Sequence, residues 1–272
     1  MRQRSYLFVP GNRPERFTKA LGSGCDAVIV DLEDAVSADA KDAARASVAT
    51  WLSGQVSAHV RINAVGTPWF EDDLQMCCEA GVETLVLPKA ERSVNISDIV
   101  ARLRVHGHTP RIVPLIESAQ GMWAAMDLAR SEGVERLMFG TVDFQHDLGI
   151  SGDDQELLHF RSHLVLVSRV AGLVAPIDGV TTAIADLQRL RADTLRGKRL
   201  GFGAKACIHP TQIGVVNDCY QAGADERAWA QRVIEAAGAA KGDAIAVDGH
   251  MVDRPVLARA EAILAGVGRN ET

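Results

Sequence analysis

Eight short apolar runs, separated by segments with helical periodicity, limit the fold of this chain more than any other feature of its sequence. The runs start 22 to 40 residues apart and cover Ser5–Pro10, Ala27–Asp31, His59–Asn63, Thr84–Lys89, Arg111–Glu117, Arg136–Gly140, Pro176–Val180 and Ala204–His209. Helical periodicity is found between them, for example in Ala38–Leu52, Gln120–Ser131, His159–Gly172 and Ile184–Gly197. Apolar strands that alternate with helices are typical of a parallel sheet covered by helices. Eight such units predict an α/β fold, a closed (β/α)8 TIM barrel, with an open doubly wound sheet as the alternative.

The end of the chain departs from this regular alternation. Helical patterns, a turn-rich piece and a last helix follow the eighth run, over Thr211–Ala222, Asp225–Lys241, Asp243–Asp253 and Arg254–Leu264. We expect residues 1–240 to form the barrel domain and residues 241–272 to form a C-terminal helical lid segment, with a hinge at Lys241-Gly242-Asp243. A tail of about 30 residues cannot bury a core by itself, so it must pack on the barrel or on a partner.

Charge and apolar content argue against several classes of protein. The 272 residues carry 29 Lys and Arg against 35 Asp and Glu, a net charge of −6, whereas nucleic-acid-binding proteins usually present a basic face. No apolar run reaches the ~18 residues that cross a bilayer, and the N-terminal apolar stretch is too short for a signal peptide. The five cysteines are odd in number and lack CxxC spacing, which favours reduced thiols. We therefore expect a cytoplasmic protein with no nucleic-acid and no membrane partner.

Charged residues follow nearly every predicted strand. The acids among them are Asp31, Glu33, Asp34, Glu117, Asp143 and Asp178, and the cations are Arg13, Arg61 and Lys89. A single polar residue at a strand end is common, but the carboxyl ends of barrel strands converge on one rim, where the active sites of such barrels lie. The sequence therefore predicts an active site at this rim.

A divalent metal is the simplest compensation for so many acids. Clustered carboxylates repel one another unless protons or cations balance them. Glu117 and Asp143 end the fifth and sixth strands, which are neighbours, so they could share one Mg²⁺. The competing interpretation is that these carboxylates cap the helices that follow. Glu33 and Asp34 fit it well, whereas Glu117 fits it poorly because Ser118 is the better cap.

The predicted rim also contains groups that could bind an anion. Arg61 ends the apolar strand HVRIN, and it could either pair with a neighbouring rim carboxylate or clamp a carboxylate or enolate oxygen of a substrate. Gly140, Thr141 and Val142 precede Asp143, and their backbone N–H groups could face an anion.

Two further rim residues have an ordinary structural interpretation beside a functional one. Lys89 could form a Schiff base, although a metal-binding carboxylate pair would make that chemistry unnecessary. His209 stands before Pro210, so it could bind substrate or simply cap the next helix.

Nine segments together resemble one known family. They are SYLFVPGNRPERFTKA (5–20), DAVIVDLEDAV (26–36), VRINAVGTPWFEDDL (60–74), LVLPKAE (85–91), PLIESAQGM (114–122), LMFGTVDFQHDLGI (137–150), APIDGV (175–180), KACIHPTQI (205–213) and DGHMVDRP (248–255). In this order, along the whole chain, the sequence resembles the citrate lyase β-subunit-like branch of the HpcH/HpaI aldolase superfamily, which includes malyl-CoA and citramalyl-CoA lyases. Phe144 departs from the family pattern, where Leu is usual, and we expect only a packing effect.

The resemblance implies roles for the rim residues. Glu117 and Asp143 would hold Mg²⁺, with Mn²⁺ as a possible replacement. Arg61 would contact the acyl oxygens of the substrate. Glu33 and Asp34 would orient that arginine or the metal-bound waters, so we count Glu33 among the catalytic residues and Asp34 among the substrate-binding ones.

The resemblance also implies a coenzyme A site and an oligomer. Arg13, Arg16 or Lys19 of the opening segment would line the coenzyme A channel, and we place His209 with them. Asp253 in the MVD motif would be offered to a neighbouring subunit as an acid or base. We therefore expect a homo-oligomer, a trimer or a hexamer.

The activity expected from the resemblance is Mg²⁺-dependent carbon–carbon cleavage. The substrate would be a 3-hydroxy-3-carboxyacyl thioester of the citramalyl, malyl or citryl type. Retro-Claisen cleavage would give a 2-oxo acid and acetyl- or propionyl-CoA. The alternatives are a citryl-acyl-carrier-protein lyase subunit that needs partner chains, and a class II aldolase of free 2-oxo acids.

Overall fold

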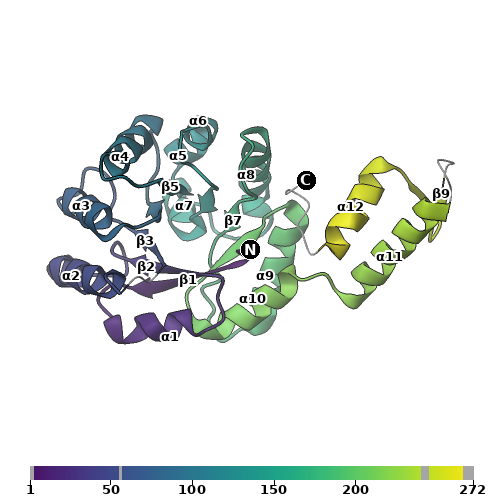
Figure 1. The fold of residues 1–272 in the computed structure, drawn as a ribbon, viewed down its shortest axis with the longest axis horizontal. Helices are drawn as coiled ribbons and strands as arrows, with labels where there is room; N and C mark the ends of the chain where they lie inside the picture. Colours follow the sequence, from purple (N-terminus) through teal and green to yellow (C-terminus); the bar gives the residue numbers. More distant parts are fainter. Residues whose placement is uncertain (1–2, 55–56, 240–244, 266–272) are drawn as a thin grey trace.

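Eight parallel strands close into a barrel in the computed structural model, which describes residues 3–54, 57–239 and 245–265 (Figure 1). The strands are β1 (Ser5–Pro10), β2 (Ala27–Asp31), β3 (His59–Arg61), β4 (Thr84–Leu87), β5 (Arg111–Ile116), β6 (Met138–Phe139), β7 (Ile177–Asp178) and β8 (Ala204–Cys207). Each strand pairs with the next, and β1 pairs with β8 through the register Ser5↔Lys205. This closure confirms the predicted TIM barrel and rules out the open sheet.

Helices surround the barrel and connect successive strands (Figure 1). They are α1 (Phe17–Leu21), α2 (Lys41–Leu52), α3 (Phe70–Ala80), α4 (Ser93–Val105), α5 (Ala119–Trp123), α6 (Ala125–Ala129), α7 (Thr141–Leu148), α8 (Leu158–Val170), α9 (Leu187–Leu200) and α10 (Ile213–Tyr220). Short 3₁₀ turns precede some of them, namely η1 (Pro14–Arg16), η2 (Ala38–Ala40), η3 (Gln155–Leu157) and η4 (Pro210–Gln212). The segment predicted as one helix over 120–131 is two short helices, α5 and α6, that meet at Ala124.

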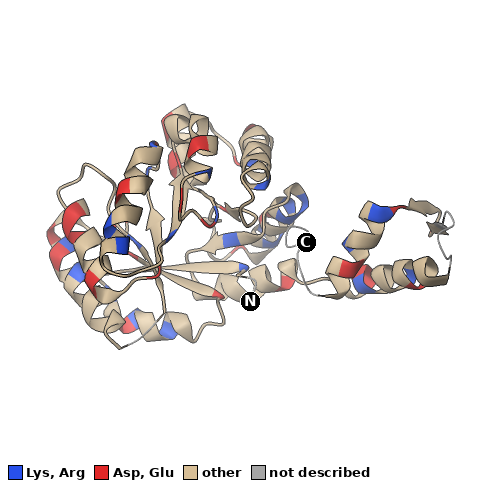
Figure 2. Ribbon diagram, turned by 45° about the horizontal axis from the view of Figure 1, so that its top comes forward, with Lys and Arg blue, Asp and Glu red and all other residues tan. Residues whose placement is uncertain are grey.

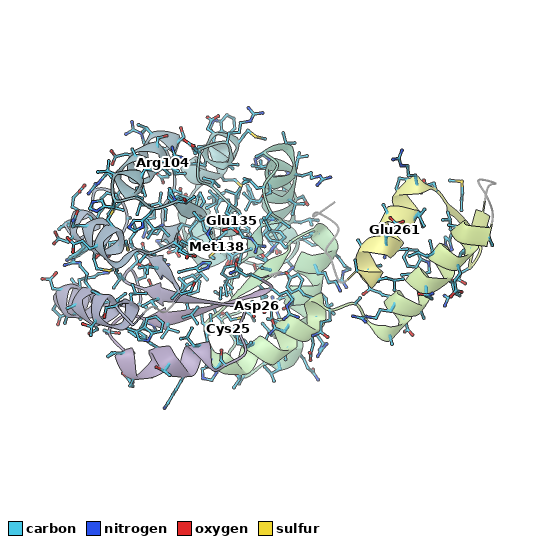
Figure 3. The ribbon with its side chains drawn as sticks, in the orientation of Figure 1. Cys25, Asp26, Arg104, Glu135, Met138 and Glu261 are labelled. Atoms are coloured by element: carbon cyan, nitrogen blue, oxygen red, sulfur yellow. The ribbon has the colours of Figure 1, made fainter. Side chains whose placement is uncertain are left out.

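Side chains of the strands alternate between two apolar layers, as the period of two requires. The inner layer fills the barrel and includes Ile29, Met138 and Ile177, and Met138 is labelled inside the ring of strands in Figure 3. The outer layer, between strands and helices, includes Val30 and Phe139. Several predicted strands were too long at their ends. Arg136–Gly140, for example, is a strand only over Met138–Phe139.

Polar groups close the floor of the barrel at the amino ends of the strands. The Arg136 guanidinium is buried, and it donates hydrogen bonds to the Tyr6 hydroxyl (2.9 Å) and to the carbonyls of Gln3 and Ala175. The His59 ring packs edge-on against Tyr6, with ring centroids 5.5 Å apart. Its Nδ1 atom is buried and has no hydrogen-bond partner among the described residues.

A small C-terminal unit projects from the barrel (Figure 1). It contains α11 (Ala224–Ala239), the antiparallel strands β9 (Ile245–Val247) and β10 (His250–Val252), and α12 (Arg254–Leu264). Its own buried cluster joins Ala230 and Val233 of α11 to Ala260 of α12, and Figure 3 labels Glu261 in this unit.

The apolar residues of α11 pack against α12. The domain boundary at residues 240 and 241 stays a prediction. The predicted hinge at Lys241-Gly242-Asp243 lies outside the described residues.

The piece predicted only as turn-rich contains a β-hairpin. Asp248 and Gly249 connect its strands with φ angles of +52° and +79°. Two positive φ angles are the mark of a type I′ turn, which an Asp-Gly pair between apolar residues predicts. This sequence signal was present and was missed.

Charges of both signs are spread over the outer helices (Figure 2). Within the described ranges, no helix has both the length and the apolar character needed to cross a membrane. The five cysteines are free thiols.

Candidate active site at the carboxyl end of the barrel

An arginine held by two acids is the central feature of the barrel rim. Arg61, at the end of β3, donates to Asp31 through Nε (2.7 Å) and Nη2 (2.5 Å), which makes a two-point ion pair with the end of β2. Its Nη1 lies 2.9 Å from Glu33 Oε2, and its guanidinium lies over the ring of Phe8 at 5.0 Å. Burial alone would lower the pKa of Arg61, but the charge and hydrogen bond of Asp31, together with the charges of Glu33 and Glu117, outweigh this effect and raise it. Arg61 is thus a fixed, permanently charged group.

Glu33 links this arginine to a lysine. Its Oε1 accepts a hydrogen bond of 2.7 Å from Lys89 Nζ. Its Oε2 is buried, and its ion pair with Arg61 lacks the alignment of a hydrogen bond, so this oxygen has no hydrogen-bond donor in the described parts of the chain. Burial raises the pKa of Glu33, although Arg61 and Lys89 oppose the shift. Glu33 Oε2 is therefore paired with Arg61 by charge but receives no hydrogen bond from the described residues.

Lys89 is held as a cation in a strained backbone conformation. Burial is the largest single effect and lowers its pKa, but the hydrogen bond to Glu33 and the charges of Glu33, Asp34 and Glu117 together outweigh it, so the net shift is upward. A protonated amine cannot attack a carbonyl, which argues against a Schiff base. Its φ angle of +46° is rare for a residue with a side chain. This conformation directs the Lys89 N–H to Glu117 Oε1 at 2.7 Å, so the strain serves to orient a neighbouring acid.

Glu117 and Asp143 follow the neighbouring strands β5 and β6, but Asp143 lies in a helix and does not end the sixth strand as predicted. Glu117 is buried directly after β5, and Asp143 is half-buried in the first turn of α7, which follows β6. Burial, the charge of Glu33 and the charge of Asp143 raise the pKa of Glu117 to about 8, against the opposing effects of the Lys89 N–H and Arg61. This electrostatic conflict is what a divalent cation would relieve, and oxygen donors are the ligands that Mg²⁺ prefers.

The glycine before α7 makes room for Glu117. A Cβ atom on Gly140 would lie 2.5 Å from Glu117 Cβ and 2.7 Å from Glu117 Oε2, so no larger residue fits. Thr141 is buried at the start of α7, whereas Val142 is half-exposed on the rim. Gly140 thus places the amino end of α7 beside Glu117; the role of its N–H groups in binding an anion stays a prediction.

A buried lysine that the sequence analysis missed fixes the loops after β2 and β3. Lys41 Nζ, near the start of α2, donates to the carbonyls of Leu32 (2.8 Å) and Glu33 (2.7 Å) and to Asn63 Oδ1 (2.6 Å). Asn63 in turn donates to the buried Asp73 through its backbone (2.9 Å) and side chain (2.6 Å). All three protons of the ammonium are used. Lysines near helix starts are usually exposed, so the sequence carried no signal for this role.

Other predicted residues lie around this centre with different partners. Asp178 is not a rim acid, because it faces the helices and pairs with the buried Arg161. His209 Nδ1 accepts the N–H of Thr211 and caps η4, which is the ordinary interpretation given above. Asp34 is exposed after β2, next to Glu33.

The residues predicted for coenzyme A lie after β1 on the same side of the barrel. Arg13 is exposed and pairs with Glu15 at 2.7 Å, and Arg16 lies 3.8 Å from the same carboxylate. Lys19 is exposed on α1. Their side chains are accessible to a ligand, and the structure gives them no role at the centre of the site.

Asp253 lies in the projecting unit, away from the rim of its own barrel. It caps α12 by accepting the Val256 N–H at 3.0 Å. The hairpin that precedes it stands at the outer end of the unit (Figure 1). One chain alone therefore does not bring Asp253 to Arg61.

Sequence comparison agrees with this geometry. Residues 4–210 match the family described as HpcH/HpaI aldolase/citrate lyase. The chain belongs to this family. A citrate lyase subunit beta-like protein of Deinococcus radiodurans is 35% identical over 277 residues, which cover 96% of each chain. A (3S)-malyl-CoA thioesterase of Cereibacter sphaeroides is 34% identical over 285 residues, again covering 96% of each.

Solved structures of the HpcH/HpaI aldolase/citrate lyase family show the same fold. The CitE protein of Mycobacterium tuberculosis, in complex with magnesium, acetoacetate and coenzyme A, superimposes with a TM-score of 0.87 at 32% identity. The match covers 98% of this chain and 99% of CitE, so the similarity includes the projecting C-terminal unit.

Proposed function

We propose that the protein is a Mg²⁺-dependent carbon–carbon lyase that cleaves a 3-hydroxy-3-carboxyacyl-CoA thioester into a 2-oxo acid and acetyl- or propionyl-CoA. The observation that carries this proposal is the arrangement of Glu117 and Asp143, a carboxylate pair in electrostatic conflict, beside the fixed cation Arg61. The magnesium, acetoacetate and coenzyme A bound by the similar CitE protein support it. A coarser conclusion, membership in a lyase family, does not depend on it.

Glu117 and Asp143 would hold the metal. Both offer oxygen ligands, Glu117 from a buried and Asp143 from a half-buried position, and Gly140 leaves the Glu117 carboxylate free of steric hindrance. When bound, a divalent cation would orient the hydroxyl and carboxylate of the substrate and acidify the hydroxyl. Mn²⁺ has similar ligand preferences and would serve in its place.

Arg61 and Glu33 would then act on the substrate itself. Glu33 Oε2, the buried oxygen without a hydrogen-bond donor, would accept the hydroxyl proton. The C–O bond becomes a carbonyl as the adjacent carbon–carbon bond breaks, and the electron pair of that bond passes to the thioester as an enolate. Arg61 would stabilise the enolate oxygen, because its orientation is already fixed by Asp31. Asp34 and the amino end of α7 would position the substrate.

The thioester carrier would lie across the loop after β1. Arg13, Arg16 and Lys19 offer exposed cations for the phosphates of coenzyme A. His209, after β8, borders the same loop because β8 pairs with β1.

Asp253 would reach the rim from a second copy of the chain. In that position its carboxyl group would donate the proton that converts the enolate into the acyl-CoA product, and the unit would exclude water. This proposal requires a homo-oligomer, and we propose a trimer or hexamer.

The decisive experiment is an assay of the purified protein with Mg²⁺ and either malyl-CoA or citramalyl-CoA. A lyase releases glyoxylate or pyruvate together with acetyl-CoA, whereas a thioesterase, like the Cereibacter sphaeroides relative by its name, releases free coenzyme A and the hydroxy acid. Asp143→Ala should abolish 2-oxo acid formation and leave the circular dichroism spectrum unchanged. Wild-type turnover by Asp143→Ala would refute the metal assignment. Inactivity towards both thioesters that is reversed by acyl-carrier and transferase chains would favour the subunit alternative.

A further inference from the structure

A buried ion pair behind the barrel wall has no part in the chemistry proposed above. Arg161 of α8 and Asp178 at the end of β7 are each 1% exposed. We infer that this pair positions the turn from Gly140 to Asp143, and thereby sets the affinity of the site for its divalent cation. The inference rests on the proposed metal site, and Arg161 is a positioning residue because it does not touch substrate or metal.

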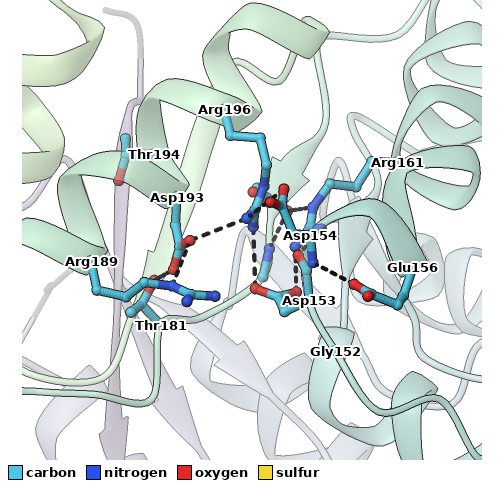
Figure 4. Close-up of polar contacts among 12 residues, drawn as sticks. Gly152, Asp153, Asp154, Glu156, Arg161, Thr181, Arg189, Asp193, Thr194 and Arg196 are labelled. Carbon is cyan, nitrogen blue, oxygen red and sulfur yellow. Dashed lines mark hydrogen bonds and ion pairs between the residues drawn. The ribbon is translucent and has the colours of Figure 1, made fainter.

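All three nitrogens of the Arg161 guanidinium donate hydrogen bonds to buried or half-buried acceptors. Its Nε donates to Asp178 Oδ1 at 3.0 Å, and Nη1 and Nη2 donate to the carbonyl and Oδ1 of Asp153, each at 2.7 Å. Figure 4 shows Arg161 and Arg196 converging on Asp153 from α8 and α9. The arginine therefore joins the end of β7 to the loop that follows α7.

The end of β7 touches the metal-binding turn directly. Asp178 Oδ1 accepts the N–H of Gly179 at 3.0 Å, which fixes the backbone there. A Cβ atom on Gly179 would collide with Thr141 Oγ1 and would lie 3.0 Å from the Phe139 carbonyl. Because backbone and turn meet without a gap, displacement of Gly179 must displace Thr141, and Asp143 follows Thr141 by two residues.

A second contact reaches the same turn through aromatic rings. The Arg161 guanidinium lies 5.8 Å from the centre of the Phe139 ring. Phe139 packs edge-on against Phe144 at 5.2 Å, and Phe144 packs against Phe160 at 4.7 Å. Phe139 directly precedes the turn from Gly140 to Asp143 and Phe144 directly follows it, so the two rings flank the turn from the layer between strands and helices. The departure of Phe144 from the family pattern thus lies within this contact.

The electrostatics explain why the arginine is needed. Asp178 Oδ2 is buried with no hydrogen-bond partner in the described parts of the chain, and it faces α9, where a Cβ on Gly197 would lie 2.8 Å away. Arg161 is the cation paired with Asp178. Removal of one partner from a buried pair leaves an uncompensated charge, which the structure relieves by moving.

The test is a titration with Mn²⁺, followed by electron paramagnetic resonance of the free ion, on the wild-type chain and four variants. One of them, Asp143→Asn, changes a proposed metal ligand. Arg161→Met should raise the dissociation constant for Mn²⁺ by 10- to 100-fold, the range typical of groups that orient metal ligands. Arg161→Lys retains a charge near Asp178 and should raise it less. Arg4→Met is the matched control, since it breaks the two-point ion pair of Arg4 with Asp26 at the opposite end of the barrel (2.9 and 3.1 Å). Arg4→Met should have a lower melting temperature than wild type, but its affinity for Mn²⁺ should stay within twofold of the wild-type value.

Several results would overturn the inference. One is Mn²⁺ binding by both Arg161 variants within twofold of wild type, while Asp143→Asn loses binding. Another is an equal loss of affinity in Arg4→Met, which would show general loosening of the barrel. Wild-type Mn²⁺ binding by Asp143→Asn would refute the metal site itself, and the inference with it. If Arg161→Met does not fold, Arg161→Lys and Asp178→Asn decide the question by the same measurement.

Discussion

Replacement of His59 by Phe should flatten the pH dependence of stability in mild acid. Burial lowers the pKa of His59 from 6.5 to about 4, and the cations Arg111 and Arg136 add to this effect. The unfolded chain takes up the proton at its ordinary pKa, so it binds more protons than the folded chain between these values. Stability is therefore complete above pH 6.5 and is lost as the pH falls towards 4.

The size of the effect follows from the two pKa values. A difference of about 2.5 units corresponds to about 3 kcal/mol when it is fully expressed. At pH 5 the His59 ring of the folded chain is still mostly neutral. The free energy of unfolding at this pH is expected to be about 2 kcal/mol lower than at pH 7. Phe keeps the edge-on contact with Tyr6 and carries no proton, so this part of the loss should vanish.

Urea unfolding of the barrel at pH 7 and pH 5 measures the difference. Between pH 7 and pH 5, the free energy of unfolding of wild type should fall by about 2 kcal/mol more than that of His59→Phe. His106→Gln serves as the control, because His106 is exposed at the end of α4. This variant should lose as much unfolding free energy between pH 7 and pH 5 as wild type. Equal losses in wild type and His59→Phe would show that this ring does not stay neutral, and the argument from burial would be wrong.

Three further perturbations test the site. Gly140→Ala should lower the free energy of unfolding by about 1–3 kcal/mol and weaken Mn²⁺ binding, because its Cβ would lie 2.5 Å from a metal-site carbon; Gly214→Ala, where no atom lies within 4 Å of the added Cβ, should do neither. Lys41→Met should lower the free energy of unfolding by at least about 2 kcal/mol in a urea titration, since three buried acceptors lose their donor; an unchanged midpoint would contradict this. Asp253→Ala should reduce kcat by about 10²–10⁴, and an unchanged kcat would remove Asp253 from the mechanism.

The barrel was predictable because apolar strand segments and helical segments alternate along nearly the whole chain. Each strand must bury both faces, so its apolar residues are continuous, and β1 and β2 were located to the residue. The lengths of the short strands β6 and β7 were overestimated, since apolar residues continue beyond the bounds of each strand. A helical pattern does not say which neighbour covers a helix, so the sequence did not predict that α11 packs against α12.

The partners within the site were harder to predict. Asp31 and Asp178 both end strands, yet Asp31 pairs with Arg61 inside the rim and Asp178 pairs with Arg161 outside it. The alternation of side chains along each strand predicts this difference. Ile29 faces the barrel interior, so Asp31, two residues later, faces it too. Ile177 also faces the interior, so the adjacent Asp178 must face outwards. Lys41 gave no such signal, because its role depends on loops that meet only after folding.

The charge balance around Arg61 has a consequence for the order in which ligands bind. Asp31 and Glu33 already neutralise Arg61 and Lys89, so chloride or phosphate entering the barrel mouth meets no excess of positive charge. Glu117, whose pKa is raised to about 8, and Asp143 add no positive charge that would attract a negatively charged ligand. A divalent ion supplies such a charge, and we expect anionic thioesters to enter readily only after the ion has arrived or together with it.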